Sequence, residues 1–356
     1  MLTTILLSGV ISMVAALLGT RLAIAVMRRR ELGQPVRADG PRAHLSKSGT
    51  PTMGGIVIIA ASLAGYAAWH LLTGIQVTAS GVLVLLLMTA LGLVGFADDF
   101  IKLFLRRSLG LRSGAKLAGQ AAAGAVFAVL AARFPGSFDI TPASPHLSFL
   151  ADFGVAAGPV LFVAWIIVMV TGTSNAVNLT DGLDGLAAGP VTMVLAAYVA
   201  IGYWQFRNDC TTALFRGCYA VRDPRDAAVV AAAVAGACIG FLWWNAPPAR
   251  IFMGDTGSLA LGGALAGLVI VTRTELLLVL LGGLFVMVAL SVVIQVGSYK
   301  LTRRRVLKMA PLQHHFELAG WPETTIVVRF WLIAAMFVAL GLVVFFRGSV
   351  VGLPGS

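Results

Sequence analysis

Residues 80–99 read SGVLVLLLMTALGLVGFADD, an apolar run that ends in two adjacent aspartates. A helix that crosses the hydrocarbon core of a bilayer needs about 20 such residues. Similar runs recur along the chain, of which 58% of the 356 residues are hydrophobic and 12% are charged. Too few polar side chains remain to cover a water-soluble globule. The composition predicts an integral membrane protein and excludes the disordered, collagen-like and disulfide-scaffold classes.

The apolar runs predict an all-α integral membrane protein with about ten transmembrane helices. The expected spans are 3–26, 55–72, 80–97, 116–132, 157–173, 186–204, 227–244, 259–272, 276–298 and 327–346. No basic residue precedes the first run, so we expect it to be retained as a span and not cleaved as a signal peptide. Without an internal repeat or a long linker, residues 1–356 are expected to form a single domain.

Most of the 26 Lys and Arg residues fall in alternate loops, which places those loops on the cytoplasmic side. The loops are 27–55, 98–116, 245–258 and 299–326. Both termini are therefore expected outside. The segment 205–226 breaks the pattern because it carries several arginines, partly balanced by aspartates. The net charge of +11 favours contact with anionic lipid headgroups and anionic substrates, and nothing in the chain indicates a nucleic-acid partner.

The three cysteines show no metal-ligand spacing. Cys210 and Cys218 fall in a loop predicted to lie outside, where an oxidising compartment permits a disulfide. A disulfide and two free thiols are both compatible with this position.

Five of the 15 acidic residues stand at the predicted cytoplasmic ends of apolar runs, where charge is costly and usually functional. They are Asp98, Asp99, Asp181, Asp184 and Asp255. Adjacent residues on a helix point about 100° apart, so the paired aspartates are expected to have different partners. Asn175, Asn178, Asp181 and Asp184 recur every third residue and so share one side of a turn. Oxygen ligands of this kind suit a hard divalent cation, which predicts a Mg2+ site.

Residues 254–258, GDTGS, precede a predicted helix whose N-terminus favours phosphate, although an ordinary N-cap is the alternative for Asp255 or Ser258. His314 and His315 lie beside a basic stretch and can bind phosphate or exchange protons. The glycine-rich residues 44–55, with Lys47 and Thr52, resemble an anion-binding loop but lack the ending of a P-loop. Carboxylates, cations and glycine-rich backbone on one face predict metal-assisted phosphoryl transfer to or from a lipid.

These runs, in this order, resemble the polyprenyl-phosphate N-acetylhexosamine-1-phosphate transferase superfamily. The GTPTMGG run at 49–55 and the HHFE run at 314–317 are similar to its phospho-N-acetylmuramoyl-pentapeptide transferase family. The resemblance implies transfer of phospho-MurNAc-pentapeptide from UDP-MurNAc-pentapeptide to undecaprenyl phosphate, which gives UMP and lipid I for peptidoglycan. It also implies ten transmembrane helices, a site on the cytoplasmic face of the bacterial plasma membrane, and a homodimer.

The resemblance also implies roles for individual residues. Those implied to be catalytic are Asp98, Asp99, Asp255, His314 and His315. Those implied to bind substrate are Lys47, Thr52, Lys102, Lys116, Asn175, Asn178, Asp181, Asp184, Phe252, Ser258 and Gln295, with Phe252 placed to stack on uracil. The implied Mg2+ ligands are Asp255 and Asn178.

One residue departs from the family pattern, because Gln313 stands where the first of three consecutive histidines is usual. Glutamine cannot carry a proton at neutral pH, so we expect His314 and His315 to suffice. Two mechanisms remain open: direct attack by the lipid phosphate with Asp98 as base, and a two-step route through an aspartyl-phosphate. The alternative functions are GlcNAc-1-phosphate transfer to the same lipid and cation-coupled transport.

Overall fold

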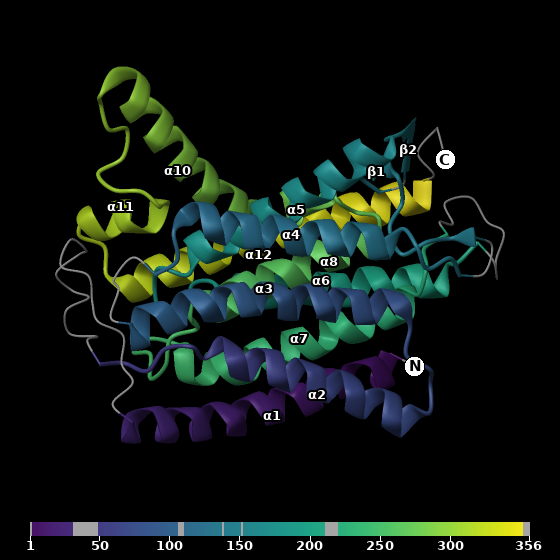
Figure 1. Cartoon of the computed structure of the whole chain (residues 1–356), viewed down its shortest axis with the longest axis horizontal. Coiled ribbons are helices and arrows are strands. Elements are labelled where there is room, and N and C mark those ends of the chain that lie inside the picture. The colour runs from purple at the N-terminus through teal and green to yellow at the C-terminus, as the bar shows by residue number, and fades with distance from the viewer. Residues whose placement is uncertain are drawn as a thin grey trace.

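The computed structural model is a bundle of long helices (Figure 1) and describes residues 2–30, 49–105, 110–136, 139–150, 152–210 and 220–351. The elements in chain order are α1 (Leu2–Arg29), α2 (Gly55–Thr73), α3 (Ala79–Phe104), α4 (Ser113–Ala131), β1 (His146–Ser148), β2 (Asp152–Ala156), α5 (Pro159–Thr180), α6 (Ala188–Arg207), α7 (Pro224–Asn245), α8 (Gly254–Val271), α9 (Leu277–Leu281), α10 (Gly283–Thr302), α11 (Leu312–Leu318) and α12 (Glu323–Val351).

The long helices confirm the all-α membrane class. Within the described ranges, nine helices are long and apolar enough to cross a membrane. The predicted span 186–204 forms α6 but is not one of these nine, because it contains Pro190 and ends in Gln205 and Arg207. Most of α6 is buried against other helices, which tolerate polar side chains better than lipid does. The ten-span topology therefore stays a prediction.

Two helices form the centre of the bundle. Buried residues make up 78% of the apolar stretch of α7 and 89% of that of α8, but only 22% of that of α1. Both central helices are rich in Gly and Ala, which allow helix backbones to approach closely in a membrane. At Gly262 of α8, for example, a side-chain Cβ would lie 2.4 Å from Cα of Ser174 on α5. Small residues thus let α8 pack against several neighbours at once.

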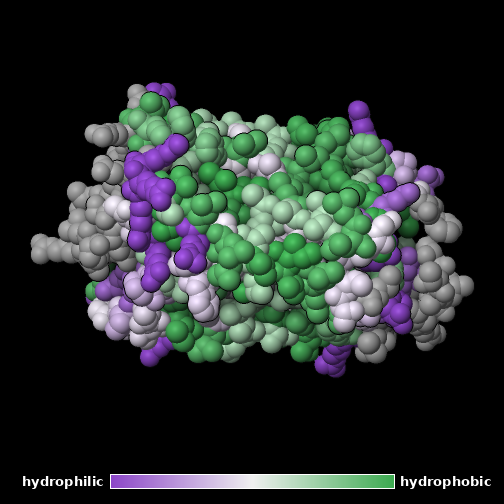
Figure 2. Space-filling model, turned by 90° about the horizontal axis from the view of Figure 1, so that it is seen from below, coloured by the Kyte–Doolittle hydropathy of each residue, from purple (hydrophilic) through white to green (hydrophobic). Residues whose placement is uncertain are grey.

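The two ends of the bundle are unlike each other. Helix α1 begins and α12 ends at the same end, where β1 and β2 also lie (Figure 1). The two strands form an antiparallel hairpin that pairs Ser148 with Asp152, and the sequence had not predicted it. Figure 2 shows apolar surface across the middle of the molecule and polar residues towards both ends. This distribution fits a bundle whose two ends lie at the two faces of a bilayer.

The predicted span 276–298 is divided in the structure. Gly282 ends the short helix α9 and precedes α10, because glycine is a poor residue for a helix interior. Helix α10 then leaves the bundle at an angle (Figure 1), and the chain returns so that the first residue of α11, Leu312, donates to Ser291 Oγ in the middle of α10 at 3.0 Å. The cysteines differ in state: Cys210 is disulfide-bonded, Cys238 is a buried free thiol, and Cys218 lies outside the described residues.

Candidate active site

Three carboxylates meet where the C-terminal end of α3 contacts the N-terminal end of α8. One oxygen from each of Asp98, Asp99 and Asp255 can be chosen so that all three lie within 4.8 Å of one another. Gly95 permits this contact, because a Cβ at that position would lie 2.1 Å from the backbone oxygen of Asp255. The predicted convergence of these acids is therefore present in the structure.

Asp99 is directed at the first turn of α8. Its Oδ2 accepts hydrogen bonds from the backbone nitrogen of Thr256 at 2.9 Å and from Thr256 Oγ1 at 2.7 Å. Its Oδ1 accepts from the backbone nitrogen of Asp255 at 3.1 Å. A carboxylate in this place satisfies free N–H groups of the helix and opposes its positive end. Asp99 thus fixes the start of α8 against α3.

Asp98 has different partners, as the helical geometry predicted. Its Oδ1 accepts from the backbone nitrogen of Leu111 at 2.7 Å, and its Oδ2 forms an ion pair with Lys102 one turn along α3. Asp98 as a whole is only 2% exposed. Burial beside an ammonium group leaves this carboxylate both confined and charge-compensated.

Asp255 lies at the centre of the site and is contacted from three helices. Its Oδ2 pairs with Lys102 Nζ at 2.9 Å and with Lys116 Nζ at 2.8 Å. Its Oδ1 accepts from Asn178 Nδ2 at 2.8 Å. Asp98, Asp99 and Asp255 form an all-oxygen donor set, which fits a hard divalent cation. A cation held by Asp255 Oδ2 has to compete with the two ammonium groups, so the structure links metal binding to the position of both lysines.

The amide stripe of α5 serves two purposes. Asn178 Nδ2 donates to Asp255 Oδ1 and to Ser258 Oγ, each at 2.8 Å. The amide nitrogen of Asn178, and not its oxygen, therefore faces the carboxylate. Ser258 also donates to the backbone of Gly254. Asn175, one turn earlier, donates to Gln120 Oε1 of α4 at 2.8 Å. Asn178 and Ser258 thus belong to the carboxylate cluster, whereas Asn175 joins α5 to α4.

Asp181 and Asp184 follow α5 in the turn that leads to α6. Burial, together with the nearby carboxylates of Asp255, Asp99 and Asp184, raises the pKa of Asp181 to about 8. This electrostatic influence places Asp181 near the cluster. Asp184 instead accepts a hydrogen bond from the backbone of Ala249 at 2.9 Å. It is buried, and the contact joins this turn to the segment after α7.

Residues 51–55 run alongside the segment that precedes α8. Backbone hydrogen bonds join Phe252 to Pro51, Gly54 to Phe252, and Gly55 to Met253, all between 2.8 and 2.9 Å. Thr52 is buried, and its Oγ1 has no hydrogen-bond partner among the described residues. Phe252 is half-buried. Lys47, also predicted to bind substrate, lies outside the described residues.

Helix α11 lies against the turn between α5 and α6. Gln313 is fully buried and donates to the backbone oxygen of Leu179 at 2.9 Å. His314 pairs with Glu317 and lies against Gly182. His315 Nδ1 accepts from the backbone nitrogen of Lys308 at 3.1 Å, so the neutral ring carries its proton on Nε2. The residue that departs from the family pattern therefore holds α11 in place by one hydrogen bond.

Gln295 has a local role in the structure. Its Oε1 accepts from the backbone nitrogens of Val306 and Leu307, at 3.0 and 2.9 Å, and its Nε2 donates to the Leu307 oxygen at 3.0 Å. All these contacts lie in the segment between α10 and α11. Among the described residues, the hydrogen bonds of Gln295 do not reach the carboxylates, and its amide instead shapes the loop that carries α11.

Two residues that serve the site had no assigned role in the sequence prediction. Thr256 binds Asp99 twice, and Gln120 binds Asn175. The signal for Gln120 was present, since a lone amide in an apolar span is costly unless it has a partner. Thr256 lies within the GDTGS run that was interpreted as a phosphate-binding helix start, but its bond to Asp99 could not be predicted, because a hydroxyl at the start of a helix is usual.

Comparison with known proteins agrees with this arrangement. The sequence profile of glycosyl transferase family 4 matches residues 81–273, and signature 1 of the phospho-N-acetylmuramoyl-pentapeptide-transferases matches residues 47–59. A curated phospho-N-acetylmuramoyl-pentapeptide-transferase of Kineococcus radiotolerans is 61% identical over 98% of this chain and 99% of its own length. Relatives of the same name from Streptomyces avermitilis and Thermobifida fusca are 59% and 57% identical, covering 98% and 97% of this chain and 99% and 98% of their own lengths.

Proposed function

This chain belongs to the phospho-N-acetylmuramoyl-pentapeptide transferases, and on that basis we propose that it moves phospho-MurNAc-pentapeptide from its UDP donor to undecaprenyl phosphate. The products are UMP and lipid I of peptidoglycan synthesis. The observation that carries the proposal is the meeting of Asp98, Asp99 and Asp255 with two lysines at one end of a membrane bundle. Such a site can bind a pyrophosphate next to a lipid substrate.

Asp255 is proposed to hold Mg2+, with Asn178, which contacts Asp255 Oδ1, as the second residue of the metal site. When bound, the metal neutralises phosphate charge and orients the pyrophosphate. Lys102 and Lys116 are proposed to exchange their carboxylate contacts for phosphate oxygens of the donor. Their ammonium groups already reach the same oxygen of Asp255, so this exchange needs only side-chain movement.

Asp98 is proposed as the proton acceptor in a direct displacement. Its carboxylate takes the proton of the undecaprenyl phosphate hydroxyl, and the phosphate oxygen forms a bond to the sugar-linked phosphorus of the donor. The bond from that phosphorus to the bridging oxygen breaks, and UMP leaves with that oxygen. Asp99 is less suited to accept the proton or attack phosphorus, because its oxygens accept three hydrogen bonds from the first turn of α8. Oδ2 of Asp98 is instead paired with the Lys102 side chain, which can move away. We therefore assign Asp99 a positioning role.

The remaining predicted residues are proposed to surround the two substrates. His314 and His315 on α11 are assigned to the phosphate and sugar side, near Asp181 in the adjoining turn. Thr52 is assigned to the nucleotide side, where its buried hydroxyl keeps hydrogen-bonding capacity. Lys47 and Phe252 belong to the same proposal, the latter as a stacking surface for uracil.

The setting of the reaction is also proposed. Both described ends of the chain lie opposite the carboxylate cluster (Figure 1), which agrees with termini outside and a cytoplasmic site in the bacterial inner membrane. The basic loops at 98–116 and 299–326 lie at the end that holds the cluster, as the positive-inside rule requires. A homodimer is part of the same proposal and rests on the family resemblance.

The proposal is tested by UMP release from purified protein in detergent, with UDP-MurNAc-pentapeptide and undecaprenyl phosphate, with and without Mg2+. UDP-GlcNAc is the control donor. We expect Mg2+-dependent release with the muramyl donor alone. Release with UDP-GlcNAc alone would identify the sibling transferase, and ion uptake into sealed vesicles without UMP release would identify a transporter.

A second measurement separates the two mechanisms. Active enzyme is mixed with donor carrying a labelled phosphosugar, in the absence of the lipid acceptor, and is then denatured and examined for bound label. Direct displacement predicts no label on the protein. Stoichiometric label that disappears on addition of undecaprenyl phosphate would establish the aspartyl-phosphate route instead.

A further inference from the structure

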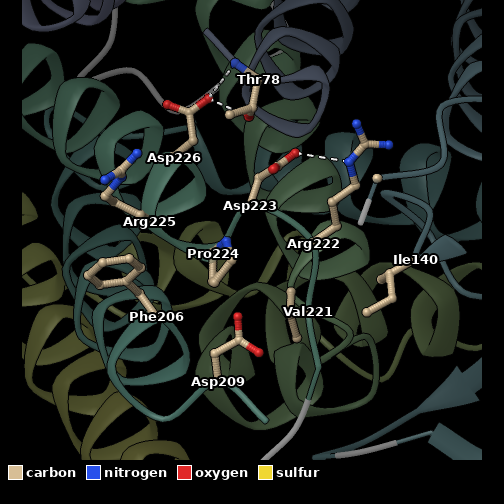
Figure 3. A pocket seen from close by; sticks show the side chains of 11 residues that line it. Thr78, Ile140, Phe206, Asp209, Val221, Arg222, Asp223, Pro224, Arg225 and Asp226 are labelled. Carbon is tan, nitrogen blue, oxygen red and sulfur yellow. Dashed lines mark hydrogen bonds and ion pairs between the residues drawn. The ribbon is translucent and has the colours of Figure 1, made fainter. Parts of the chain in front are cut away.

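A second pocket, of about 540 Å3, lies far from the carboxylate cluster (Figure 3). It is formed where α3 and α7 begin and α6 ends, with the segment after α4 as a further wall. Thr78, at the start of α3, lines this pocket, whereas Asp98 and Asp99 lie near the end of the same helix. A helix rises 1.5 Å per residue, so the two sites are about 30 Å apart. Nothing in the transferase reaction uses this pocket.

The residues that line the pocket are unusually rich in charge for the end of an apolar bundle. The charged residues are Asp209 and those of the sequence RDPRD at 222–226, and Phe206 lies beside them. This is the segment whose arginines break the positive-inside pattern. These arginines run against the positive-inside pattern, so a function for their charge at this end of the bundle is worth seeking.

Arg222 has hydrogen-bonding capacity that the described residues do not use. Its side chain is 15% exposed, and its Nε lies 3.2 Å from Asp223 Oδ2. Nε and Nη1 are buried, and neither has a hydrogen-bond partner of good geometry among the described residues. Gly136 leaves room for this group, because a Cβ there would lie 3.1 Å from Nε of Arg222. An arginine held in this way is prepared to bind an oxyanion.

Arg225 provides a second cation on the same wall. Its guanidinium lies 5.5 Å from the ring centroid of Phe206, which orients it without neutralising its charge. Figure 3 shows Arg225 and Arg222 on either side of Asp223 and Asp226. Two arginines that both border one cavity are a frequent arrangement for recognising phosphate.

The acids on this wall are largely committed to the protein itself. Asp226 is buried and accepts from Tyr66 at 2.8 Å and from Thr78 Oγ1 at 2.6 Å, and it pairs with His70 at 3.0 Å. Asp223 accepts from Ser80 Oγ at 2.9 Å. These contacts join α2, α3 and α7 and build a rigid wall. Asp223 and Asp226 are therefore occupied by protein contacts, whereas Asp209 and the two arginines also line the pocket.

We propose that this pocket binds the phosphodiester headgroup of a membrane phospholipid. Arg222 and Arg225 contact the phosphate, and the acyl chains lie along the apolar surface between the polar ends of the bundle (Figure 2). The membrane helices α3 and α7 begin at the pocket and α6 ends there, which places it at the depth of headgroups. The same phosphate chemistry occurs in soluble phosphate esters, and the test separates the two sources.

The experiment is native mass spectrometry of the full chain in detergent, titrated with dioleoylphosphatidylglycerol or with glycerol 3-phosphate. We expect one tightly held lipid on the wild type and little binding of glycerol 3-phosphate. Arg222→Gln and Arg225→Gln should each weaken retention of that lipid about tenfold, the loss expected for a charge-assisted hydrogen bond. Arg207→Gln is the matched control, because it removes an exposed cation at the same end that does not line the pocket.

Ile140→Trp, which fills the pocket from its apolar side, should abolish retention while leaving both arginines in place. UMP release by every variant should match the wild type, which shows that the protein is folded. Equal retention by the arginine variants and the control would overturn the proposal. Binding of glycerol 3-phosphate as tight as that of the lipid would overturn the assignment to a membrane phospholipid.

Discussion

The adjacent residues Asp98 and Asp99 have separate tasks because a helix turns them in different directions. Asp98 contacts Lys102 and the backbone of Leu111, whereas Asp99 binds the first turn of α8. One carboxylate can therefore serve the reaction while the other holds the helix that carries Asp255. We expect the loss of either carboxylate to stop catalysis, and only the loss of Asp99 also to weaken the fold.

We predict that Asp98→Asn and Asp99→Asn both abolish UMP release but differ in stability. Asp99→Asn should lower the free energy of unfolding by about 1–3 kcal/mol, since hydrogen bonds to a charged acceptor at α8 are weakened. Asp98→Asn should have a smaller effect, because its amide oxygen can still accept from Leu111. Thermal unfolding in detergent measures this, with Thr256→Val as a probe of one bond to Asp99. Equal melting temperatures for the two aspartate variants would contradict the positioning role.

Gln313 stands where related sequences usually have a histidine, and the structure shows what this position does. Its burial and its bond to the Leu179 oxygen require a donor at this position and not a group that titrates. Histidine can supply the same donor. We predict that Gln313→His keeps kcat within about threefold. Gln313→Leu should destabilise the protein by about 1–3 kcal/mol, because a buried carbonyl loses its partner. A large gain in kcat for Gln313→His would show that the histidine acts in the chemistry.

At the scale of elements, the site depends on how closely α3 approaches α8. Gly95→Ala would place a methyl group 2.1 Å from the Asp255 carbonyl oxygen, so the helices must separate. We predict destabilisation of about 1–3 kcal/mol and at least a tenfold loss of UMP release. Gly172→Ala on α5 is the control, because nothing lies within 4 Å of its added methyl group. Full activity in Gly95→Ala would show that the carboxylates do not need this close contact.

The opposite end of the bundle offers a prediction on pH. Glu275 follows α8 and is buried next to the hairpin, where Leu276 donates to the backbone of Ser148 at 3.0 Å. Burial is the largest effect on the pKa of Glu275 and outweighs the lowering effects of Ser148 and Arg273. The resulting pKa is raised to about 8. An ordinary glutamate pKa is about 4.3. The folded protein thus binds this proton more tightly than the unfolded chain does.

The stability that this proton contributes is fully present below about pH 4 and is lost as the pH rises to about 8. Glu275→Gln cannot ionise, so its melting temperature should exceed that of the wild type increasingly as pH is raised from 5 to 9. Asp139→Asn, at an exposed acid in the same region, is the comparison. Parallel curves for the wild type and Glu275→Gln would refute a buried, neutral Glu275.

At the scale of the whole molecule, the orientation in the membrane can be tested directly. Thr3 and Arg347 lie near the described ends of the chain, and Ser113 lies at the opposite end of the bundle; all three are exposed. We predict that an impermeant maleimide labels Thr3→Cys and Arg347→Cys in intact cells. Ser113→Cys should react only after permeabilisation. Labelling of Ser113→Cys in intact cells would place the carboxylate cluster outside and contradict a cytoplasmic reaction.

Much of the architecture could be predicted from the sequence, because hydropathy and charge act over neighbouring residues. The apolar runs match helices to within about seven residues at their ends, and three of the acids at those ends, Asp98, Asp99 and Asp255, do converge. The hairpin at β1 and β2 and the division at Gly282 were missed, since short elements carry little hydropathy signal. Gln295 was placed near the phosphates by resemblance, yet its amide binds the loop after α10.

By itself the sequence determined that this chain crosses a membrane, that its polar clusters gather at one face and that it belongs to a transferase family. Local composition decides the first two, because each span must satisfy the bilayer on its own. Only the tertiary structure decided which polar groups meet. Asp99 and Thr256 are 157 residues apart in the chain, and their contact depends on glycine at position 95 and on the packing of α8 among its neighbours. No local pattern encodes such a contact, since its energy arises only when both helices are in place.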